Sequence, residues 1–327
     1  MARHAVTFSR RALLAGAALA LPATASATRA ETGRITLIVP FAAGGPTDIV
    51  ARLAADGMAR HLGRAVIVEN FAGAGGATGT LRAARARPDG TTMVLGQMAT
   101  HALTPILNPQ AGYDPLADFV PIGLIANAPM VIAARKGLPA SSLREFRDFV
   151  AGSGNRLSFG HAGLGATSQV ACELFNRGTG AAPVSIAYRG TAPALNDLAA
   201  GQIDFACDQL TSIAPLIRSG HIQGVALMAA TRSPVLPDLP SAAEQGFPDL
   251  SVEVWNGLLF PRGTPQTVVA EVHAALTTAL DDPGLIRRFE ELGASVPAGA
   301  ANTPAAFGAL IRSENARWRP VLERLTR

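Results

Sequence analysis

Short runs of β-branched residues alternate with amphipathic segments of helical period along most of this chain. The first run, 35–39, is followed by a segment in which Val50, Ala54 and Met58 recur every four residues, and that segment ends at Gly63. Strands are predicted at 35–39, 66–69, 92–95, 120–125, 130–133, 157–160, 184–187, 203–206 and 225–229, and helices at 47–62, 77–87, 142–151, 167–177, 192–200 and 212–219. This alternation predicts an α/β fold with mostly parallel sheets that helices cover on both faces.

The length of the chain predicts more than one domain. It has 327 residues, of which 48% are hydrophobic, and glycine and proline are spread between the apolar segments rather than gathered in one tract. A single core rarely organises so many residues, so we expect two globular domains.

The N-terminus has the order of a cleaved export signal. Arg3, Arg10 and Arg11 precede an apolar run at 12–21, and small residues follow up to Ala27. The apolar run is too short to span a bilayer. We therefore predict a cleaved export signal within residues 1–30 that directs the chain to the periplasm, with cleavage at or near Ala27.

The paired arginines also suggest the export route. Residues 9–14, SRRALL, fit the twin-arginine pattern, although adjacent arginines occur in ordinary signals too.

Residues 1–30 contain four arginines and no acidic residue, so the formal charge of +4 falls to 0 for residues 31–327. A neutral mature chain gives no reason to expect nucleic acid or a membrane surface as a partner.

Two cysteines allow two interpretations. Cys172 falls within a helical pattern and Cys207 ends a strand-like run. They are either separate buried thiols or, in an oxidising compartment, a disulfide. No motif around either one supports a catalytic thiol.

Three glycine-rich loops follow predicted strands and lead into helices, at 40–48, 70–79 and 160–168. The N–H groups at a helix N-terminus favour an anion, and Lys136 is the only lysine of the chain. The loops therefore suggest that backbone groups capture a carboxylate, unless the glycines only make tight turns. A dinucleotide fingerprint fits less well, because Thr78 and Ser168 stand where its third glycine belongs.

An enzyme is the main rival class. The chain has no Gly-x-Ser-x-Gly, His-Glu-x-x-His or Cys-x-x-Cys motif. Asp48 and Asp208 could form an acid–base pair, but Asp48, like Thr47, is better explained as a helix cap. We therefore predict no catalytic activity, no metal and no cofactor.

A series of short motifs runs through the chain in a fixed order. They are Pro40-Phe41 with Gly44-Gly45 and Asp48, Gly73-Ala74-Gly75-Gly76, Pro88-Asp89-Gly90, Tyr113-Asp114-Pro115 with Asp118-Phe119, Tyr188-Arg189-Gly190, Gly201-Gln202 with Asp204 and Asp208, Arg232-Ser233-Pro234, Trp255-Asn256-Gly257-Leu258 and Gly263-Thr264-Pro265. The order of these motifs resembles a known family, the tripartite tricarboxylate transporter receptors, also called Bug proteins. The match runs from Ile35 to about Trp318. At position 170, where the family often has His, this chain has Val170.

The resemblance implies a two-domain periplasmic-binding-protein (Venus-flytrap) fold with a hinge. Domain one is expected at 31–125 plus 250–327, including helices near 266–280 and 304–325, and domain two at 126–249. A monomer of this family would bind a small mono-, di- or tricarboxylate, including amino or aromatic acids, in the cleft between the domains. Its partners would be the membrane permease subunits of a tripartite transporter, or alternatively a membrane sensor kinase.

The resemblance and the glycine loops together indicate a set of ligand-binding residues at the cleft. These are Phe41, Gly44, Gly45, Gly75, Gly76, Thr78, Ala99 and Thr100 in domain one, and Gly163, Gly165, Ala166, Thr167, Ser168, Tyr188, Gly190 and Asp208 in domain two. Two of them have structural alternatives: Tyr188 as a core aromatic residue and Asp208 as a cap of the following helix. His101 and His161 are expected near the cleft, where lone histidines are more often locally bonded than functional.

Overall fold

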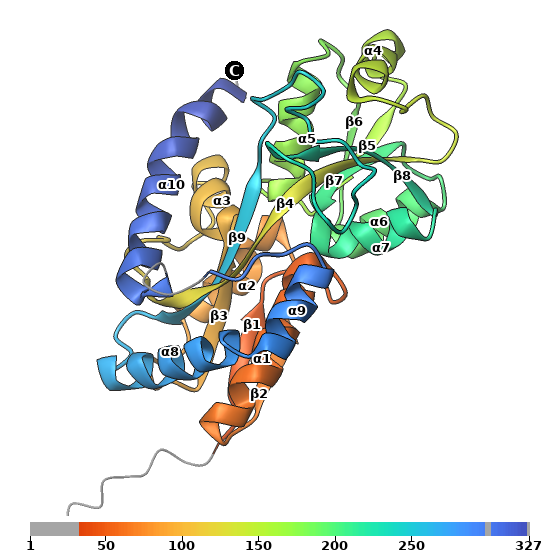
Figure 1. Ribbon diagram of the computed structural model, residues 1–327. Helices are drawn as coiled ribbons and strands as arrows, with labels where there is room; N and C mark the ends of the chain where they lie inside the picture. Colours follow the sequence, from red (N-terminus) through yellow and green to blue (C-terminus); the bar gives the residue numbers. More distant parts are fainter. Residues whose placement is uncertain (1–32, 298–301, 326–327) are drawn as a thin grey trace, which may run out of the picture. The chain divides into compact units, whose positions relative to one another are not determined.

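The computed structural model describes residues 33–297 and 302–325 of the chain, so the predicted export signal at 1–30 lies outside the described residues. Within them, strands and helices alternate as far as the eighth strand (Figure 1). The strands are β1 Ile35–Val39, β2 Val66–Asn70, β3 Thr92–Gln97, β4 Phe119–Arg135, β5 Ser158–His161, β6 Val184–Ala187, β7 Phe205–Gln209, β8 Ile222–Met228 and β9 Glu253–Pro261. The helices are α1 Pro46–Leu62, α2 Ala77–Ala84, α3 Thr104–Leu107, α4 Leu143–Ser153, α5 Thr167–Arg177, α6 Thr191–Ala199, α7 Leu210–Arg218, α8 Gln266–Leu280, α9 Pro283–Glu291 and α10 Pro304–Leu325.

The strands form one mixed sheet in the order β2-β1-β3-β9-β4-β7-β5-β6, with β8 also paired to β4. The pairs β1–β2, β1–β3, β5–β6 and β5–β7 are parallel, as strand–helix–strand units require. The pairs that involve β4 or β9 are antiparallel. The predicted α/β class is confirmed. The parallel strands form two groups on either side of an antiparallel centre: the first side consists of β1, β2 and β3, and the second side of β5, β6 and β7.

One long strand, β4, joins the two sides. Its residues up to Pro129 pair with β9, and from Met130 onward it pairs with β7 and β8. The sequence predicted two strands here, at 120–125 and 130–133, but the structure has one, with register shifts between Pro121 and Gly123 and between Leu124 and Ala126. β4 crosses the predicted boundary at 125/126 without a break, so the domain limits stay a prediction.

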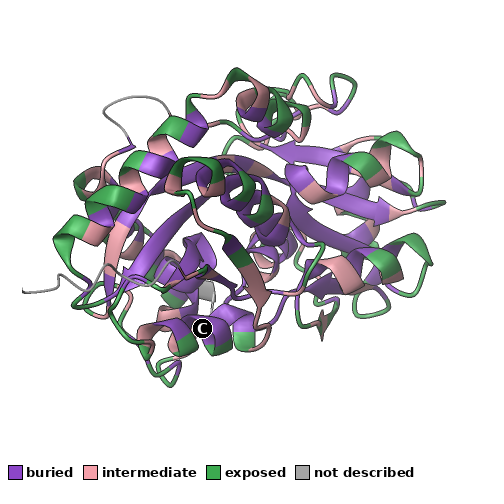
Figure 2. Cartoon of the chain, turned by 90° about the horizontal axis from the view of Figure 1, so that it is seen from below, coloured by how far each residue is buried: buried purple, intermediate pink, exposed green. Residues whose placement is uncertain are grey.

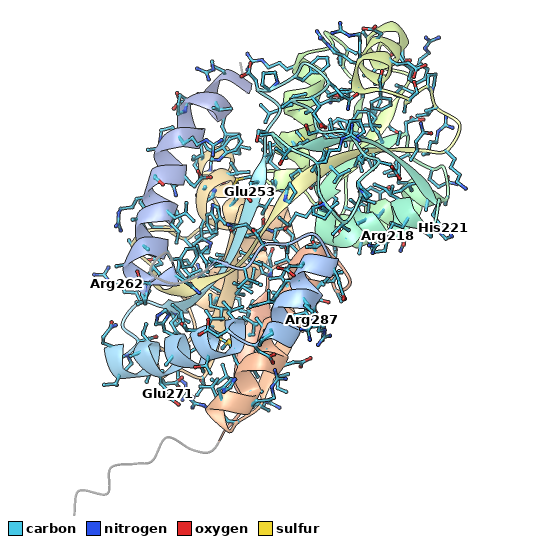
Figure 3. The ribbon with its side chains drawn as sticks, in the orientation of Figure 1. Arg218, His221, Glu253, Arg262, Glu271 and Arg287 are labelled. Carbon is cyan, nitrogen blue, oxygen red and sulfur yellow. The ribbon has the colours of Figure 1, made fainter. Side chains whose placement is uncertain are left out.

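Helices cover both faces of the sheet. The inner strands are buried and the edge strands β2 and β6 are more exposed, while the helices turn buried faces inward and exposed faces outward (Figure 2). Charged side chains such as Arg262, Glu271 and Arg287 point outward on the first side of the sheet (Figure 3). This layering leaves the loops at the strand ends as the place where chemistry can be exposed.

The helices after β9 return to the first side of the sheet. Val272 and Leu276 of α8 pack in the same core cluster as Val39 of β1 and Leu95 of β3. On α10, Phe307 meets the ring of Trp255 edge-on, with centroids 5.5 Å apart. The predicted helices at 266–280 and 304–325 are confirmed. No described helix is long and apolar enough to cross a membrane.

The two cysteines are unpaired neighbours inside the second side of the sheet. Cys172 of α5 and Cys207 of β7 are both free and fully buried. Burial, followed by the interaction with Cys207, raises the pKa of the Cys172 thiol well above its ordinary value. A buried, protonated thiol reacts slowly, because the thiolate is the nucleophile.

We predict that a maleimide probe labels neither Cys172 nor Cys207 in the native protein. After unfolding in guanidinium without reductant, both should react, and mass spectrometry should count two added groups. Labelling that requires prior reduction would instead demonstrate a disulfide.

Candidate functional site

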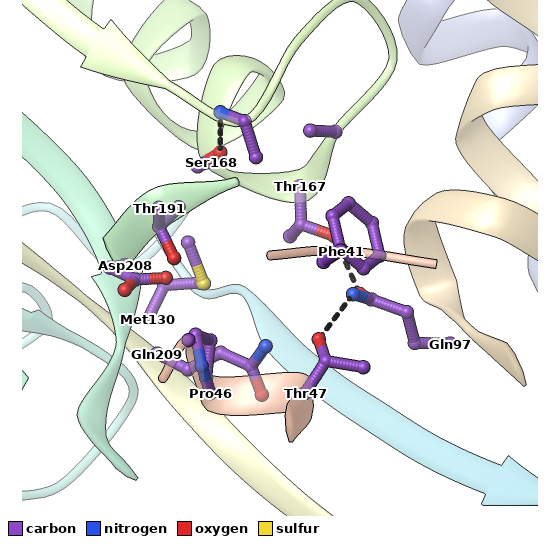
Figure 4. Close-up of a pocket in the computed structure, with 13 residues that line it drawn as sticks. Phe41, Pro46, Thr47, Gln97, Met130, Thr167, Ser168, Thr191, Asp208 and Gln209 are labelled. Atoms are coloured by element: carbon purple, nitrogen blue, oxygen red, sulfur yellow. Dashed lines mark hydrogen bonds between the residues drawn. The ribbon is translucent and has the colours of Figure 1, made fainter. Parts of the chain in front are cut away.

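Four helices of the described chain begin around one cavity. Gly45 to Thr47 start α1, Ala166 to Ser168 start α5, Thr191 starts α6, and Gln209 precedes α7. The residues that line the cavity are Phe41, Gly45, Pro46, Thr47, Gln97, Met130, Ala162, Ala166, Thr167, Ser168, Thr191, Asp208 and Gln209 (Figure 4). The first N–H groups of a helix have no partner within it, and the helix dipole makes this end positive. The cavity is therefore suited to an anion.

The loop before α1 is held by a buried carboxylate. Asp48 accepts hydrogen bonds from the Gly44 N–H (2.9 Å), from Arg52 Nε (2.9 Å) and from Asn70 Nδ2 (2.9 Å). Burial alone would raise the pKa of Asp48, but these three donors outweigh it and lower the pKa below its ordinary value.

The observed N-cap of α1 differs from the predicted one, which was Thr47 or Asp48. Gly45 is the N-cap residue and makes no side-chain cap bond. Asp48 instead reaches back from the first turn to the Gly44 N–H, as in one half of a capping box. Its carboxylate is fully engaged in shaping the loop, which argues against the acid–base pair with Asp208.

Gln97, at the carboxyl end of β3, bridges the two sides of the cavity. Its Nε2 donates to Thr47 Oγ1 on α1 (3.0 Å), and its Oε1 accepts from Thr167 Oγ1 on α5 (3.4 Å). Figure 4 shows the amide lying between the two threonines. Gln97 was not among the predicted residues, although its place at a strand end is the signal that could have found it.

Asp208 provides the charge on the opposite wall. It is 2% exposed, and its Oδ2 accepts a hydrogen bond from Ser212 Oγ at 2.6 Å. Burial raises its pKa to about 6, and hydrogen bonds from Ser212, Thr191 and the Gln209 backbone offset part of that effect. It does not cap α7, whose N-cap is Gln209 without a side-chain cap bond.

The cavity is small and carries no positive side chain. Among the described residues that line it, Asp208 is the only one with an ionisable side chain. About 20 Å³ of the cavity is open to the centre of a water molecule, which is room for about one water. Any larger molecule must enter while the surrounding loops are apart.

Part of the predicted binding set lines the cavity: Phe41, Gly45, Ala166, Thr167, Ser168 and Asp208. The others do not line it: Gly44, Gly75, Gly76, Thr78, Ala99, Thr100, Gly163, Gly165, Tyr188 and Gly190. The lining residues that the prediction missed are Pro46, Thr47, Gln97, Met130, Ala162, Thr191 and Gln209.

Several of the outer residues have their polar groups engaged elsewhere. Tyr188 donates its hydroxyl to Asp197 Oδ2 at 2.6 Å, and its ring packs on the core beside α6. Thr100 shares its hydroxyl with Gln97 and His101. His161 is bonded locally to Gly163 and Ser185, and His101 is wholly buried in the core, so neither histidine lines the cavity.

Phe41 forms one wall through a small apolar cluster. Its ring is 6% exposed and packs with Ala99, Ala162 and Ala166. A β-carbon at Gly76 would lie 2.9 Å from the ring, so only glycine lets the second loop approach it. Ala99 and Gly76 therefore act on the cavity through Phe41.

The glycine loops at 70–79 and 160–168 contact each other. A β-carbon at Gly75 would overlap the carbonyl oxygen of Leu164, and one at Gly163 would lie 2.8 Å from the Gly75 nitrogen. The Thr104 hydroxyl lies 3.0 Å from the carbonyl oxygen of Gly75 and 3.2 Å from that of Gly165, so it can donate to either. These contacts join the loops of the two sides above the cavity.

A matched pair of glycine substitutions tests this contact. Gly75 (φ 62°, ψ 25°) and Gly63 (φ 64°, ψ 18°) share one left-handed conformation, but a β-carbon at Gly63 meets no atom within 4 Å. Gly75→Ala and Gly63→Ala should each lower the free energy of unfolding by about 1–2 kcal/mol through backbone strain. Only Gly75→Ala should also speed amide hydrogen exchange in residues 163–168, because its methyl group forces the loops apart. Equal exchange in the two variants would contradict the closed contact.

Comparison with known proteins identifies relatives over most of the chain. Residues 50–326 match the model of the "Tripartite tricarboxylate transporter family receptor". MatC (Rpa3494) from Rhodopseudomonas palustris, solved with bound malate, is 40% identical with a TM-score of 0.85, over 88% of this chain and 98% of that one. The periplasmic binding protein BugD is 38% identical with a TM-score of 0.87, over 90% and 97%. R. palustris Rpa4515, solved with adipate, is 32% identical with a TM-score of 0.86, over 90% and 98%.

Proposed function

Because the chain belongs to the tripartite tricarboxylate transporter receptor family, a family of solute-binding proteins rather than enzymes, we propose that it captures a small carboxylic acid in the cavity at the four helix N-termini. The two sides of the sheet would close over the ligand, and the loops around Gly75 and Leu164 would meet above it. The function is thus recognition without a chemical step.

The convergence of helix N-termini on a cavity without a basic side chain carries this proposal. An anion there would be held by N–H groups and hydroxyls, such as those of Thr47 and Ser168. Ser168 Oγ already accepts the Ala162 N–H at 3.0 Å, which leaves its hydroxyl proton available as a donor. The relatives solved with malate and adipate support a carboxylate as the anion.

The residues that we propose to touch the ligand are those of the cavity wall. Phe41 and Met130 would contact its carbon skeleton, while Thr47, Gln97, Thr167, Ser168, Thr191 and the first amides of α1 and α5 would bind its oxygens. Residues on the closing loops, such as Gly75 and Gly165, would act by permitting closure.

A thermal-shift screen tests the proposal. A ligand that binds only the folded state adds about 2.7 kcal/mol of stability at one hundred times its dissociation constant. We expect at least one member of a panel of mono-, di- and tricarboxylates to raise the unfolding midpoint of the mature protein, and sugars and polyamines to leave it unchanged. Gly75→Ala should weaken that shift by impeding closure, whereas Gly63→Ala should keep it.

The screen can also reject the proposal. A midpoint that responds to sugars or cations but to no carboxylate would exclude an anion as the ligand. If a carboxylate raises the unfolding midpoint of Gly75→Ala and of the unmodified protein equally, binding does not depend on closure of the loops.

We further propose that the receptor is exported and works with membrane permease subunits of a tripartite transporter. The basic and apolar segments of residues 1–30 and the family membership support both statements. Mass spectrometry of the protein from the periplasmic fraction should find an N-terminus at or near Thr28. Met1 retained in that fraction would disprove cleavage, and a change of the Arg10-Arg11 pair to lysines should block export only if the twin-arginine route is used.

A further inference from the structure

Asp208 stands in the binding cavity without a positive partner. It is the next-to-last residue of β7, it pairs with Val131 of β4, and its carboxylate faces Thr191 and Met130 (Figure 4). Three groups on neighbouring elements are engaged elsewhere: Arg135 of β4 pairs with Asp204 at 2.9 Å, Asp197 of α6 accepts the Tyr188 hydroxyl, and His161 of β5 bonds Gly163 and Ser185. Arg218 lies at the opposite, C-terminal end of α7.

The protein supplies Asp208 only with neutral donors. Ser212 Oγ lies 2.6 Å from its Oδ2, and the Thr191 hydroxyl and the Gln209 N–H also favour the charged form. An ionised carboxylate can accept about four hydrogen bonds, so it retains capacity toward the cavity. The positive ends of α6 and α7, which begin beside it, also favour its negative charge.

This arrangement is unfavourable for one kind of ligand and favourable for another. A ligand that places a carboxylate against Asp208 brings two like charges together in a site of low dielectric constant. A ligand that places a hydroxyl or ammonium group there gives Asp208 the donor that the protein does not provide. The carboxylate of such a ligand would then lie at the starts of α1 and α5, beside Thr47 and Ser168.

We propose that Asp208 determines specificity by accepting a hydrogen bond from the ligand, so that the receptor selects carboxylic acids that carry a hydroxyl or ammonium group. This inference rests on the proposed function, because it names the class of carboxylate that the same cavity takes. Thr191 and Ser212 orient the Asp208 carboxylate for this contact.

The experiment compares ligands that differ only in the donor group. Isothermal titration calorimetry of the mature protein would measure the pairs lactate and propionate, malate and succinate, and mandelate and phenylacetate for a hydroxyl, and aspartate and succinate for an ammonium group. In at least one pair the unmodified protein should bind the member with the donor tenfold more tightly or better, as expected for a hydrogen bond to a charged group. The pair that shows the preference identifies which donor the site reads.

Asp208→Asn tests whether this residue carries the preference. The amide keeps the shape of the side chain but removes its negative charge, so a hydroxyl donor then makes a neutral hydrogen bond, about half as strong, and an ammonium donor loses its opposite charge. The preference should fall to about threefold or less, mainly through weaker binding of the member with the donor. Asp238→Asn, which removes one exposed negative charge outside the cavity, should keep the original preference.

The outcomes separate this inference from the function on which it rests. If no carboxylate binds, the proposed function fails and this inference fails with it. If carboxylates bind but both members of each pair bind equally, or if Asp208→Asn keeps the preference, only the specificity assignment is overturned. The comparison within the unmodified protein remains decisive even if Asp208→Asn does not fold.

Discussion

The site depends on one constraint: four helices begin at the same buried place, and the N–H groups of their first turns need acceptors. Each helix start also carries a partial positive charge, so an anion is stabilised without a basic side chain. In the proposed function, Thr47 and Ser168 would therefore suffice where an enzyme or a nucleotide-binding protein would use lysine or arginine. This constraint also gives Asp208 an unusual position, because the same field that favours a ligand carboxylate favours its own negative charge, while burial opposes it. The cavity can hold both groups only when they lie at different helix starts.

The limits of several helices could be predicted from the sequence. α5, α8 and α10 have the predicted limits. β9 was not predicted as a strand, because the polar Asn256 and the glycine at 257 interrupt its apolar pattern. In the structure Gly257 lies under the ring of Phe307, which would overlap any β-carbon there. Such a reason comes from the tertiary packing of α10 and leaves no local trace in the sequence.

The candidate site was predictable only where it coincides with a loop of marked composition. The loops at 40–48 and 160–168 were predicted to bind an anion, and Gly45, Thr167 and Ser168 do line the cavity. The loop at 70–79 looked the same in sequence, yet none of its glycines lines the cavity, and Gly75 instead meets the opposite loop at Leu164. Gln97, Thr191 and Gln209 have no signature, because their places depend on how the two sides of the sheet meet. Val170, where the family often has His, is buried in the core at 2% exposure and does not line the cavity.

The cavity is connected to the strands that join the two sides. Gln209, which lines the cavity, accepts a hydrogen bond through Oε1 from Asn256 Nδ2 of β9 at 3.3 Å. The same Asn256 nitrogen lies 3.4 Å from the carbonyl oxygen of Ala126 on β4. Asn256 is fully buried, so bulk water does not compete for these hydrogen bonds while the strands keep this geometry. A movement that separates the two sides must bend β4 and β9 and therefore displace Asn256 and the side chain of Gln209. The strands that join the two sides and the wall of the proposed binding cavity thus share one hydrogen-bonded amide pair, which would couple the polar interruption of β9 to the proposed closure.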